Sequence, residues 1–391
     1  MMAADLATTP QTGIRVQLAG DSHLANFGGF ASPERDLVFD INDFDETLPG
    51  PWEWDVKRLV ASLAIAGRER GFRTKERRTL VRSTIAQYRE AMRSFASTTN
   101  LAVFYARLDA TELLARARQE AGHRDVTRLE QRMAKATTRD SMRAFDRLTH
   151  VVDGERRIVS DPPLIVPVEE LMPEGERQQL ETQIRAALRG YRRSLPGDRR
   201  HLLEEYRLVQ LARKVVGVGS VGTRVLIALL LGENGDDPLF LQFKEAEGSV
   251  LAPFAGRSAY TNQGRRVVEG QRLLQSTSDV FLGWDRAPDL LGAERDFYVR
   301  QLWDWKISAD LKGMSPTAMA VYGRVCGWTL ARGHARSGDH RVAIAAYLGQ
   351  NDAFDRALAE FAEAYADQNE RDHSALVEAV KAGRVMAEEG V

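Results

Sequence analysis

Two clusters of carboxylate and amide side chains lie close together near the N-terminus. Residues 20–28 (GDSHLANFG) contain Asp21 and Asn26, and residues 40–46 (DINDFDE) contain Asp43. Hard cations such as Mg²⁺ prefer oxygen ligands and usually keep coordination positions for substrate phosphates. Phosphoryl transfer requires mainly metal ions on the phosphates and a carboxylate that orients the attacking group. The clusters therefore predict a magnesium site for phosphate transfer, and side chains that only cap turns are the alternative interpretation.

A glycine-rich segment, residues 217–222 (GVGSVG), fits the pattern G-x-G-x-x-G through Gly217, Gly219 and Gly222, with Ser220 between them. In a kinase such a loop joins two strands and covers the nucleotide phosphates, and a lysine on the third strand pairs with them. The segment LFLQFKEA places Lys244 at that position. These residues are therefore predicted to bind the phosphates of a nucleotide.

Two other structures use the same glycine pattern. In a dinucleotide-binding fold of the Rossmann type the loop opens a helix, and an acidic residue about 20 positions later binds the ribose. Glu245 satisfies that position, although the segment TRVLIALLLG after Gly222 is short for such a helix. A glycine turn with a purely structural role is the third interpretation.

The elements that must position these residues form an α+β chain with strands in two separate blocks. Residues 14–19 and 37–41 are predicted strands that end at the two carboxylate clusters, and 213–244 is predicted to alternate between strands and turns. Residues 52–66, most of 74–145 and the chain from 314 onward have helical periodicity. Helices are also expected at about 175–194 and 199–212, and a hairpin around Asp153-Gly154.

Composition limits the classes of partner. The net charge of −1 gives no general attraction to nucleic acid or to an anionic membrane. The single cysteine, Cys326, excludes an internal disulfide and a multi-cysteine zinc site, which is typical of a reducing compartment. No signal peptide is predicted, and the apolar run at 225–231 is too short to span a bilayer. We therefore expect a cytoplasmic protein that binds neither nucleic acid nor membranes.

The spacing of the first clusters resembles that of kinases of the aminoglycoside and choline phosphotransferase type. Those enzymes carry G-D-x-H-x-x-N and then a strand that ends in [ILV]-x-D-[FWL]; here Asn26 follows Asp21 by five positions, and 41–44 reads INDF. The resemblance implies that Asp21 is the catalytic residue that orients or deprotonates the acceptor hydroxyl. Asn26 and Asp43 would hold magnesium, with Asp45 as a further metal contact.

The same resemblance implies two supporting residues. Such kinases place an aspartate about a dozen residues after the metal-binding one, where it braces the catalytic loop, and Asp55 occupies this position at the start of a predicted helix. Lys244 would need a glutamate on the following helix, and Glu269 is the expected partner. A solvated helix glutamate is the alternative for Glu269.

In ordinary kinases the glycine-rich loop and its lysine come before the catalytic loop, whereas here they come after it. We therefore expect a two-lobed, protein-kinase-like fold that is circularly permuted and has a large helical part. Residues 1–70 would form the catalytic and metal-binding core of the C-lobe and 71–205 a mainly helical region. Residues 206–312 would form the nucleotide-binding N-lobe, and 313–391 the helices that complete the C-lobe.

Nearly the whole chain resembles a bacterial family catalogued as domain of unknown function 2252. The motifs that carry this resemblance are GDSHLANFG, VFDINDFDETLPGPWEWDVKRL, VGVGSVGTR, FYVRQL and LARGHARSGD. The expected function is an ATP- and Mg²⁺-dependent phosphotransferase that acts on an unknown small-molecule or protein acceptor. Family members usually carry a further segment ahead of the point that matches residues 2–6, so a non-catalytic nucleotide-binding relative is one alternative. A Rossmann-type dinucleotide-binding protein is the other.

Overall fold

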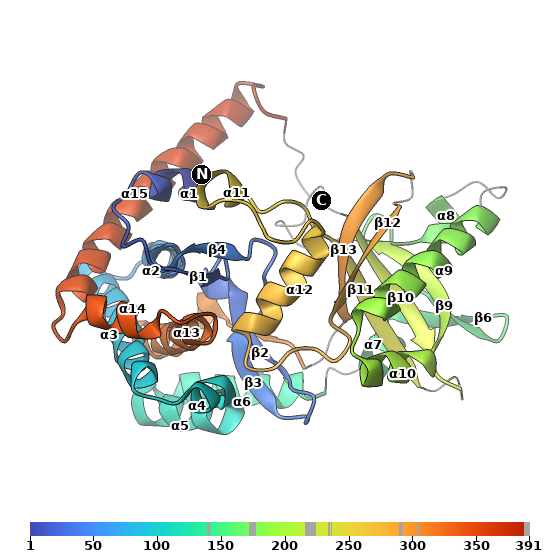
Figure 1. Cartoon of the computed structure of the whole chain (residues 1–391), viewed down its shortest axis with the longest axis horizontal. Helices are drawn as coiled ribbons and strands as arrows, with labels where there is room; N and C mark the ends of the chain where they lie inside the picture. Colours follow the sequence, from blue (N-terminus) through green and yellow to red (C-terminus); the bar gives the residue numbers. More distant parts are fainter. Residues whose placement is uncertain are drawn as a thin grey trace.

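The structure is a computed structural model of the whole chain. It describes residues 1–386 apart from 139–140, 172–176, 216–223, 234, 236, 289–291 and 303–304. Figure 1 shows a helical part on one side, a large sheet on the other, and the N-terminal strands with helix α12 between them. The fold is mixed α+β, as the sequence predicts, with strands assembled into antiparallel sheets.

The large sheet has six antiparallel strands in the order β12-β13-β11-β10-β9-β8. Their bounds are β8 Ile165–Pro167, β9 Arg207–Lys214, β10 Val225–Leu231, β11 Pro238–Glu245, β12 Gly283–Pro288 and β13 Glu294–Gln301. All residues of β10 are apolar because both faces of the sheet are covered. Ile227 and Leu229 belong to the same apolar cluster as Phe145 of α7 (Ser141–Leu148), whereas Ala228 and Leu230 belong to that of Tyr191.

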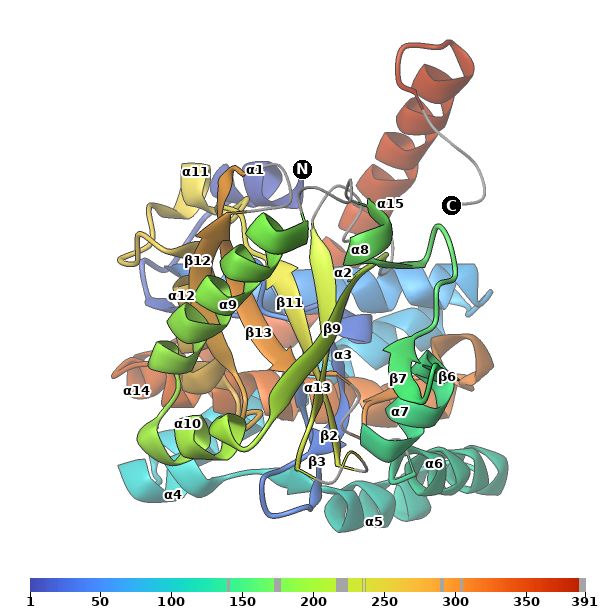
Figure 2. The same ribbon diagram turned by 90° about the vertical axis from the view of Figure 1, so that its right-hand side faces the viewer.

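Tyr191 lies on α9 (Arg177–Ser194), which packs across the sheet next to β12 (Figure 2). The short helices α8 (Val168–Leu171) and α10 (Gly197–Glu204) flank it. On the other side of β12 and β13 lies α12 (Gln263–Leu274), preceded by α11 (Ala252–Ala255). Because α12 also contacts β1 and the helical part, it joins the large sheet to the N-terminal strands.

Two small sheets carry the N-terminal polar clusters. The first pairs β1 with β4, and the second has the order β14-β2-β3-β5. Their bounds are β1 Arg15–Leu18, β2 Phe27–Ala31, β3 Leu37–Ile41, β4 Leu48–Pro51, β5 Leu108–Asp109 and β14 Ile307–Ser308. Strand β14 follows β13 of the large sheet in the sequence and pairs with β2. The chain therefore returns from the large sheet to the small sheet beside the polar clusters.

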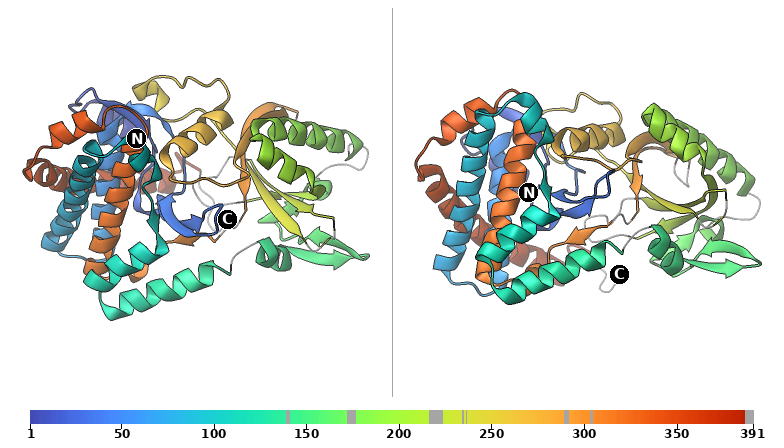
Figure 3. Two further views of the ribbon diagram at one scale, coloured as in Figure 1. Left: turned by 60° about the horizontal axis from the view of Figure 1, so that its bottom comes forward. Right: turned by 90° about the horizontal axis from the view of Figure 1, so that it is seen from below.

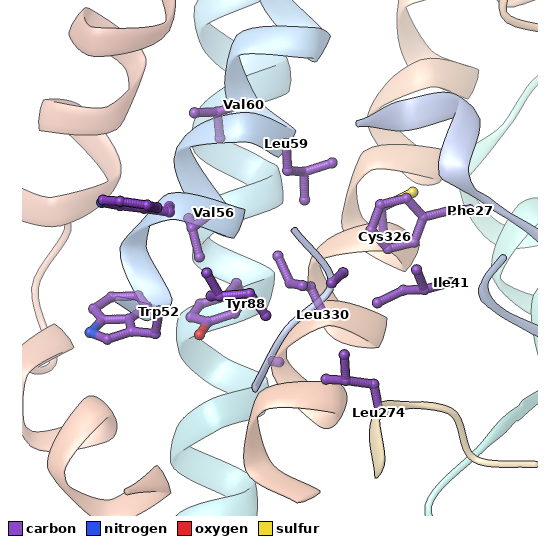
Figure 4. Close-up of a cluster of buried hydrophobic side chains, with 14 of the residues drawn as sticks. Phe27, Ile41, Trp52, Val56, Leu59, Val60, Tyr88, Leu274, Cys326 and Leu330 are labelled. Carbon is purple, nitrogen blue, oxygen red and sulfur yellow. The ribbon is translucent and has the colours of Figure 1, made fainter. Parts of the chain in front are cut away.

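The helical part is built around three long helices that share one core. Helix α2 (Trp52–Glu69) buries the face that carries Val56, Leu59 and Val60, as its spacing predicts. Figure 4 shows these side chains next to residues from α3 (Thr74–Ala96) and α13 (Pro316–Arg336). The remaining elements here are α1 Met2–Ala7, η1 Leu24–Asn26, α4 Asn100–Tyr105, α5 Ala110–Glu120, α6 His123–Ala136, η4 Leu311–Gly313, α14 Arg341–Leu348 and α15 Ala353–Lys381.

Two local predictions have different outcomes. The hairpin around Asp153-Gly154 is confirmed: β6 (Thr149–Val152) pairs with β7 (Glu155–Ile158), and both turn residues have the positive φ that Asp-Gly turns favour. The helix expected over 199–212 is wrong in its second half, because α10 ends at Glu204 and β9 begins at Arg207. Pairing of β9 with β10 and burial of its apolar side chains outweigh the helical spacing. Over the described residues, no helix is long and apolar enough to cross a membrane.

Candidate functional site

The loop between β1 and η1 carries Asp21 and is held in place by Asp55. The Asp55 carboxylate accepts hydrogen bonds from the backbone nitrogens of Ala19, at 2.7 Å, and Gly20, at 3.0 Å. It is 1% exposed and lies in the first turn of α2, where a negative charge is favoured by the helix dipole. The geometry therefore gives Asp55 the bracing contacts that the sequence resemblance implies.

A buried histidine extends this network into the helical part. His334 of α13 lies with its Nε2 3.2 Å from Asp55 Oδ2 and its Nδ1 2.8 Å from the hydroxyl oxygen of Tyr88. An ionised carboxylate only accepts hydrogen bonds, so Nε2 donates to Asp55, and in the neutral imidazole Nδ1 then accepts from the hydroxyl. His334 belongs to the LARGHARSGD motif, which thus contributes a structural link between α13 and the Asp21 loop.

Asp21 remains partly exposed, with 42% of its side chain accessible to solvent. Arg58 donates from its Nε to Asp21 Oδ1 at 2.6 Å, and His23 Nε2 lies 3.6 Å from Oδ2. Burial lowers the pKa of His23, and its Nδ1 accepts a hydrogen bond from the backbone nitrogen of Ala25. His23 therefore supports the loop as a neutral side chain, while Asp21 stays open to a ligand.

The pairing of β2 with β3 brings the two polar clusters together. Phe27 faces Ile41, and the backbone nitrogen of Asn42 donates to the carbonyl of Asn26 at 2.8 Å. Asn26 in turn donates from its side-chain nitrogen to the carbonyl of Asp21 at 2.7 Å. Asn26 and Asp43 thus lie on neighbouring segments at the same end of the small sheet.

Lys244 of β11 reaches this end from the large sheet and forms an ion pair with Asp45, although the two residues are 199 positions apart. The backbone nitrogen of Asp45 also donates to Asp43 Oδ1 at 3.3 Å. Burial is the largest influence on Asp43 and raises its pKa, but the charges of Lys244 and Arg300 outweigh it and hold the pKa below the usual range. The Asp43 carboxylate is therefore ionised.

The net pKa shift of Asp45 has the opposite sign. Burial and then the nearby charge of Asp43 raise its pKa, although Lys244 opposes them. Two carboxylates that share one buried site disfavour each other's ionisation, so the second one needs a cation. In this structure the Lys244 ammonium group is that cation.

Three residues that sequence reasoning missed complete this cluster. The Tyr298 hydroxyl donates to Asp45 Oδ1 at 2.8 Å, and Arg300 donates to the carbonyl of Asn42 at 3.4 Å and to Gln242 Oε1 at 3.2 Å. The charge of Arg300, followed by burial, lowers the pKa of Lys306 to about 8. Tyr298 and Arg300 lie in the FYVRQL motif and alternate on β13, which is a signal that both face the same side.

Helix α12 contacts the second cluster through Arg266. This side chain donates to the backbone carbonyls of Asp45, Thr47 and Glu247, each at 2.8 Å. Glu269 lies one turn further along, where its ion-pair partners are Arg265, at 4.0 Å, and Arg272, at 3.9 Å. Among the described residues, Lys244 forms its ion pair with Asp45. The expected Lys244–Glu269 pair is therefore not formed in this structure.

Other residues of the glycine-rich segment and of the second carboxylate cluster occupy different places. Gly217, Gly219, Ser220 and Gly222 lie outside the described residues, between β9 and β10. Asp40 is fully buried, forms an ion pair with Arg332 and accepts hydrogen bonds from the backbone nitrogen and the hydroxyl of Ser276. Its contacts hold β3 against the segment after α12.

The remaining residues of the LARGHARSGD motif make no common site. Arg336 donates to the carbonyls of Phe104 and Ser276 and stacks on the Phe104 ring, whereas Asp339 is exposed beyond the end of α13. Over the described ranges, no group of three or more histidine, cysteine, aspartate or glutamate side chains is arranged to hold a metal ion. Asn26, Asp43 and Asp45 combine an amide with two carboxylates.

The bacterial family described as "Uncharacterized protein conserved in bacteria (DUF2252)" matches residues 1–379 of this sequence. The chain belongs to this family. No curated protein and no solved structure matches it. The DUF2252 match includes every element that contributes to the Asp21 loop, the Asp43 cluster and Lys244. The family description assigns no activity.

Proposed function

We propose that this protein is an ATP- and Mg²⁺-dependent phosphotransferase with a circularly permuted, protein-kinase-like arrangement. The observation that carries the proposal is the ion pair between Lys244 and Asp45, beside the ionised Asp43. Kinases require a lysine on the third strand of the nucleotide-binding sheet and a metal-binding aspartate to act together on one nucleotide. The carboxylate clusters and the segment that carries Lys244 lie far apart in the sequence, in the reverse of the usual kinase order. Their contact in the fold is expected if both bind one nucleotide, and it is not expected if their roles are unrelated.

The order of elements around Lys244 supports the same interpretation. Strands β9 and β10 are antiparallel neighbours joined by the glycine-rich segment, β11 carries Lys244, and α12 follows before β12 and β13. This sequence of loop, lysine strand and helix is the one that kinases use. A dinucleotide-binding fold instead needs a helix directly after the glycine-rich loop, and β10 occupies that position.

The residues at the site suit a magnesium nucleotide. Asp43 and Asp45 supply carboxylates. The Asn26 amide nitrogen donates a hydrogen bond to the Asp21 carbonyl, so its oxygen is the atom that would ligate a metal ion. Mg²⁺ is commonly held by one or two carboxylates together with substrate phosphates, and it polarises those phosphates for attack. Lys244, Arg300 and Lys306 add positive charge around the pair of carboxylates, which favours an anionic triphosphate.

In this proposal each residue has a defined task. Asn26, Asp43 and Asp45 hold the metal ion, and Lys244 moves from Asp45 to the phosphates of the donor. Asp21 orients the acceptor hydroxyl and takes its proton as the phosphoryl group transfers, for which its partial exposure leaves access. Asp55 and His334 keep the Asp21 loop in position.

Calorimetric titration with ATP, with and without Mg²⁺, tests the proposal. Wild-type protein should bind ATP in a magnesium-dependent manner, and Asp43→Asn should weaken binding by about tenfold or more because a direct metal ligand is lost. Asp36→Asn is the matched control, since Asp36 lies at the other end of β3 and pairs with Arg107 at 2.8 Å. The proposal is wrong if ATP does not bind, or if the affinity for ATP changes neither with magnesium nor with the Asp43→Asn substitution.

Turnover separates an active enzyme from a non-catalytic relative. With water as the acceptor, wild-type protein should hydrolyse Mg·ATP slowly, and Asp21→Asn should lower the rate by about 10²–10⁴-fold, the usual contribution of a general base. ATP affinity should be unchanged by this substitution. Magnesium-dependent binding without any turnover in wild-type protein would instead identify a non-catalytic nucleotide-binding relative.

A further inference from the structure

A cavity of about 150 Å³ lies beneath the small sheet, outside the site described above. Its walls come from β2, β3 and β14 on one side and from α5, α6 and α13 on the other. Figure 3 shows α5 and α6, in teal, alongside the blue strands of this sheet. The wall is mainly apolar, with Leu37, Phe39, Leu113, Met133, Met314 and Val325 among its residues.

The charged side chains at the edge of the cavity are already engaged with protein groups. Arg132 pairs with Asp310 at 2.8 Å, and Arg128 donates to the carbonyl of Gly313 at 2.9 Å. Asp125 accepts a hydrogen bond from the Ser315 hydroxyl at 2.7 Å. Since these charges have protein partners, an uncharged ligand suits the cavity better than an acid or a base.

The size and lining define the class of ligand. The pocket is partly open to solvent, and its wall is mainly apolar. A volume of about 150 Å³ matches a benzene-sized group. A ring-sized hydrocarbon group would remove the apolar wall from water, which is favourable in proportion to the area covered, and it would not displace the ion pairs at the edge.

One wall residue connects the cavity to the loop that follows Asp21. Tyr322 lines the cavity, and its hydroxyl contacts the carbonyls of Leu24, at 2.7 Å, and Phe27, at 3.1 Å. These two carbonyls lie on either side of Asn26. Occupancy that shifts the Tyr322 ring would therefore act directly on the backbone of this loop.

We propose that the cavity is a binding site for an uncharged, ring-sized apolar group, and that its occupancy tightens residues 24–27 through Tyr322. The site is separate from the proposed nucleotide site, and its ligand would act as an effector. Ligand binding and protection of the loop are both measurable without nucleotide.

Methionine methyl groups provide a direct readout of binding. Met133 and Met314 line the cavity, whereas Met92 is buried in the helical core and Met142 is exposed. Titration of ¹³C-methyl-methionine-labelled protein with benzene should shift the first two signals to saturation and leave the other two unchanged. Shifts that grow without saturation at all four methyl groups, or no shift at Met133 and Met314, would overturn the site.

Filling the cavity gives an independent test. Ala117→Leu places a larger side chain inside it from α5, and benzene affinity should fall by about tenfold or more. Ala115→Leu on the exposed side of the same helix is the matched control and should bind benzene as wild type does. Ala121→Leu, at the end of α5, is the second filling variant if Ala117→Leu does not fold. Equal affinity in the filled and control variants would contradict the proposal.

Tyr322→Phe tests the connection to the loop. In wild-type protein benzene should slow hydrogen exchange of the amides at 24–28 by about threefold or more. In Tyr322→Phe, which keeps the ring in the cavity wall, benzene should still bind but should leave that exchange within about twofold of the ligand-free rate. An unchanged exchange rate in wild-type protein, or the same protection in both proteins, would exclude an effector role through Tyr322.

Discussion

Asp55 joins the Asp21 loop to helix α2 through hydrogen bonds that a neutral side chain is unable to reproduce. Its two oxygens accept from Ala19, Gly20 and His334, and the group is buried. In Asp55→Asn the amide nitrogen would face one of these donors, which leaves a buried polar group without a partner.

We therefore expect Asp55→Asn to lower the free energy of unfolding by about 3 kcal/mol, as measured by guanidinium denaturation. Asp36→Asn on the exposed β2–β3 turn should change it by less than about 0.5 kcal/mol. Equal stabilities for the two variants would show that Asp55 does not brace the loop. If Asp55→Asn also lowered ATP turnover at unchanged ATP affinity, the loop geometry would be shown to serve the chemical step.

Four of the residues that sequence spacing identified lie close to one another in the chain. Asp21 and Asn26 share one short loop, and Asp43 and Asp45 are nearly adjacent, so residue type and spacing indicate a common site. Arg300 was not identified, because its alternation with Tyr298 indicates a shared face of the strand but not what that face contacts. Its role is visible only when β13 is placed beside β11 and against the carbonyl of Asn42.

Helix α12 packs so closely on the segment after Asp45 that one position has room only for glycine. A Cβ at Gly270 would overlap the side chain of Thr47, which is buried and donates to the carbonyl of Leu18 at 2.6 Å. Alanine normally stabilises a helix interior by about 1 kcal/mol relative to glycine. At position 270, however, α12 would have to move to make room for the methyl group. Arg266 would then lose its contacts with the same segment.

Gly270→Ala should therefore destabilise the protein by about 1–3 kcal/mol, the usual cost of overpacking a core. The matched control is Gly197→Ala at the start of α10, where nothing lies within 4 Å of the added methyl group and the effect should be neutral or slightly stabilising. Thermal and guanidinium unfolding of both variants would test the prediction. Stabilisation by Gly270→Ala would mean that α12 is not held against Thr47.

The contact between α9 and β12 contains a carboxyl group whose ionisation opposes folding. Burial, with a contribution from the charge of Glu294, raises the pKa of Asp285 to about 6, although the backbone of Arg286 and the charge of Arg193 oppose the shift. The unfolded chain has an ordinary, lower pKa, so the folded state binds the proton more tightly between pH 4 and 6. The contribution of Asp285 to stability therefore falls as the pH rises through this range.

Asp285→Asn removes this dependence. Relative to wild type, the variant should gain stability from pH 4 to 6 and then keep a constant advantage of about 1 kcal/mol, a figure reduced for solvent screening because the side chain is only partly buried. Guanidinium unfolding of both proteins at pH 4, 5, 6 and 7 would measure the difference. A difference that is constant across this range would show that Asp285 does not titrate in this way.

At the scale of elements, local patterns predicted the Asp-Gly hairpin and the buried face of α2, because both depend on neighbouring residues. The strand β9 was missed because its residues also fit a helical spacing, and only its pairing with β10 and β8 decides the outcome. Sheet pairing between distant segments is not encoded in local periodicity.

At the scale of the whole molecule, the mixed α+β class followed from the two blocks of predicted strands. The hypothesis of a permuted kinase-like fold placed Lys244 in the same site as Asp43, but the sequence named Glu269 as its partner and did not predict the ion pair with Asp45. The cavity under β2 and β3 had no sequence signal, because its mainly apolar lining comes from segments that lie far apart in the chain.

The C-terminal helix α15 belongs to the fold only along its first half. Its buried residues, Asp355, Leu358, Ala359, Ala362 and Ala366, all precede the part of the helix that projects from the molecule in Figure 2. Glu363, in the packed half, pairs with Arg68 at 2.9 Å and with Arg77 at 2.8 Å. These ion pairs join the last helix of the chain to α2 and α3.

Removal of the residues after His373 should therefore leave the free energy of unfolding within about 0.5 kcal/mol of wild type, since the described side chains beyond it are largely exposed. Glu363→Gln should instead lower it by about 2 kcal/mol, less than for a fully buried pair because the site is partly open to solvent. Guanidinium denaturation of the truncated protein, the substituted protein and wild type would measure both effects. A truncated protein less stable than Glu363→Gln would show that the projecting half of α15 carries a contact essential to the fold.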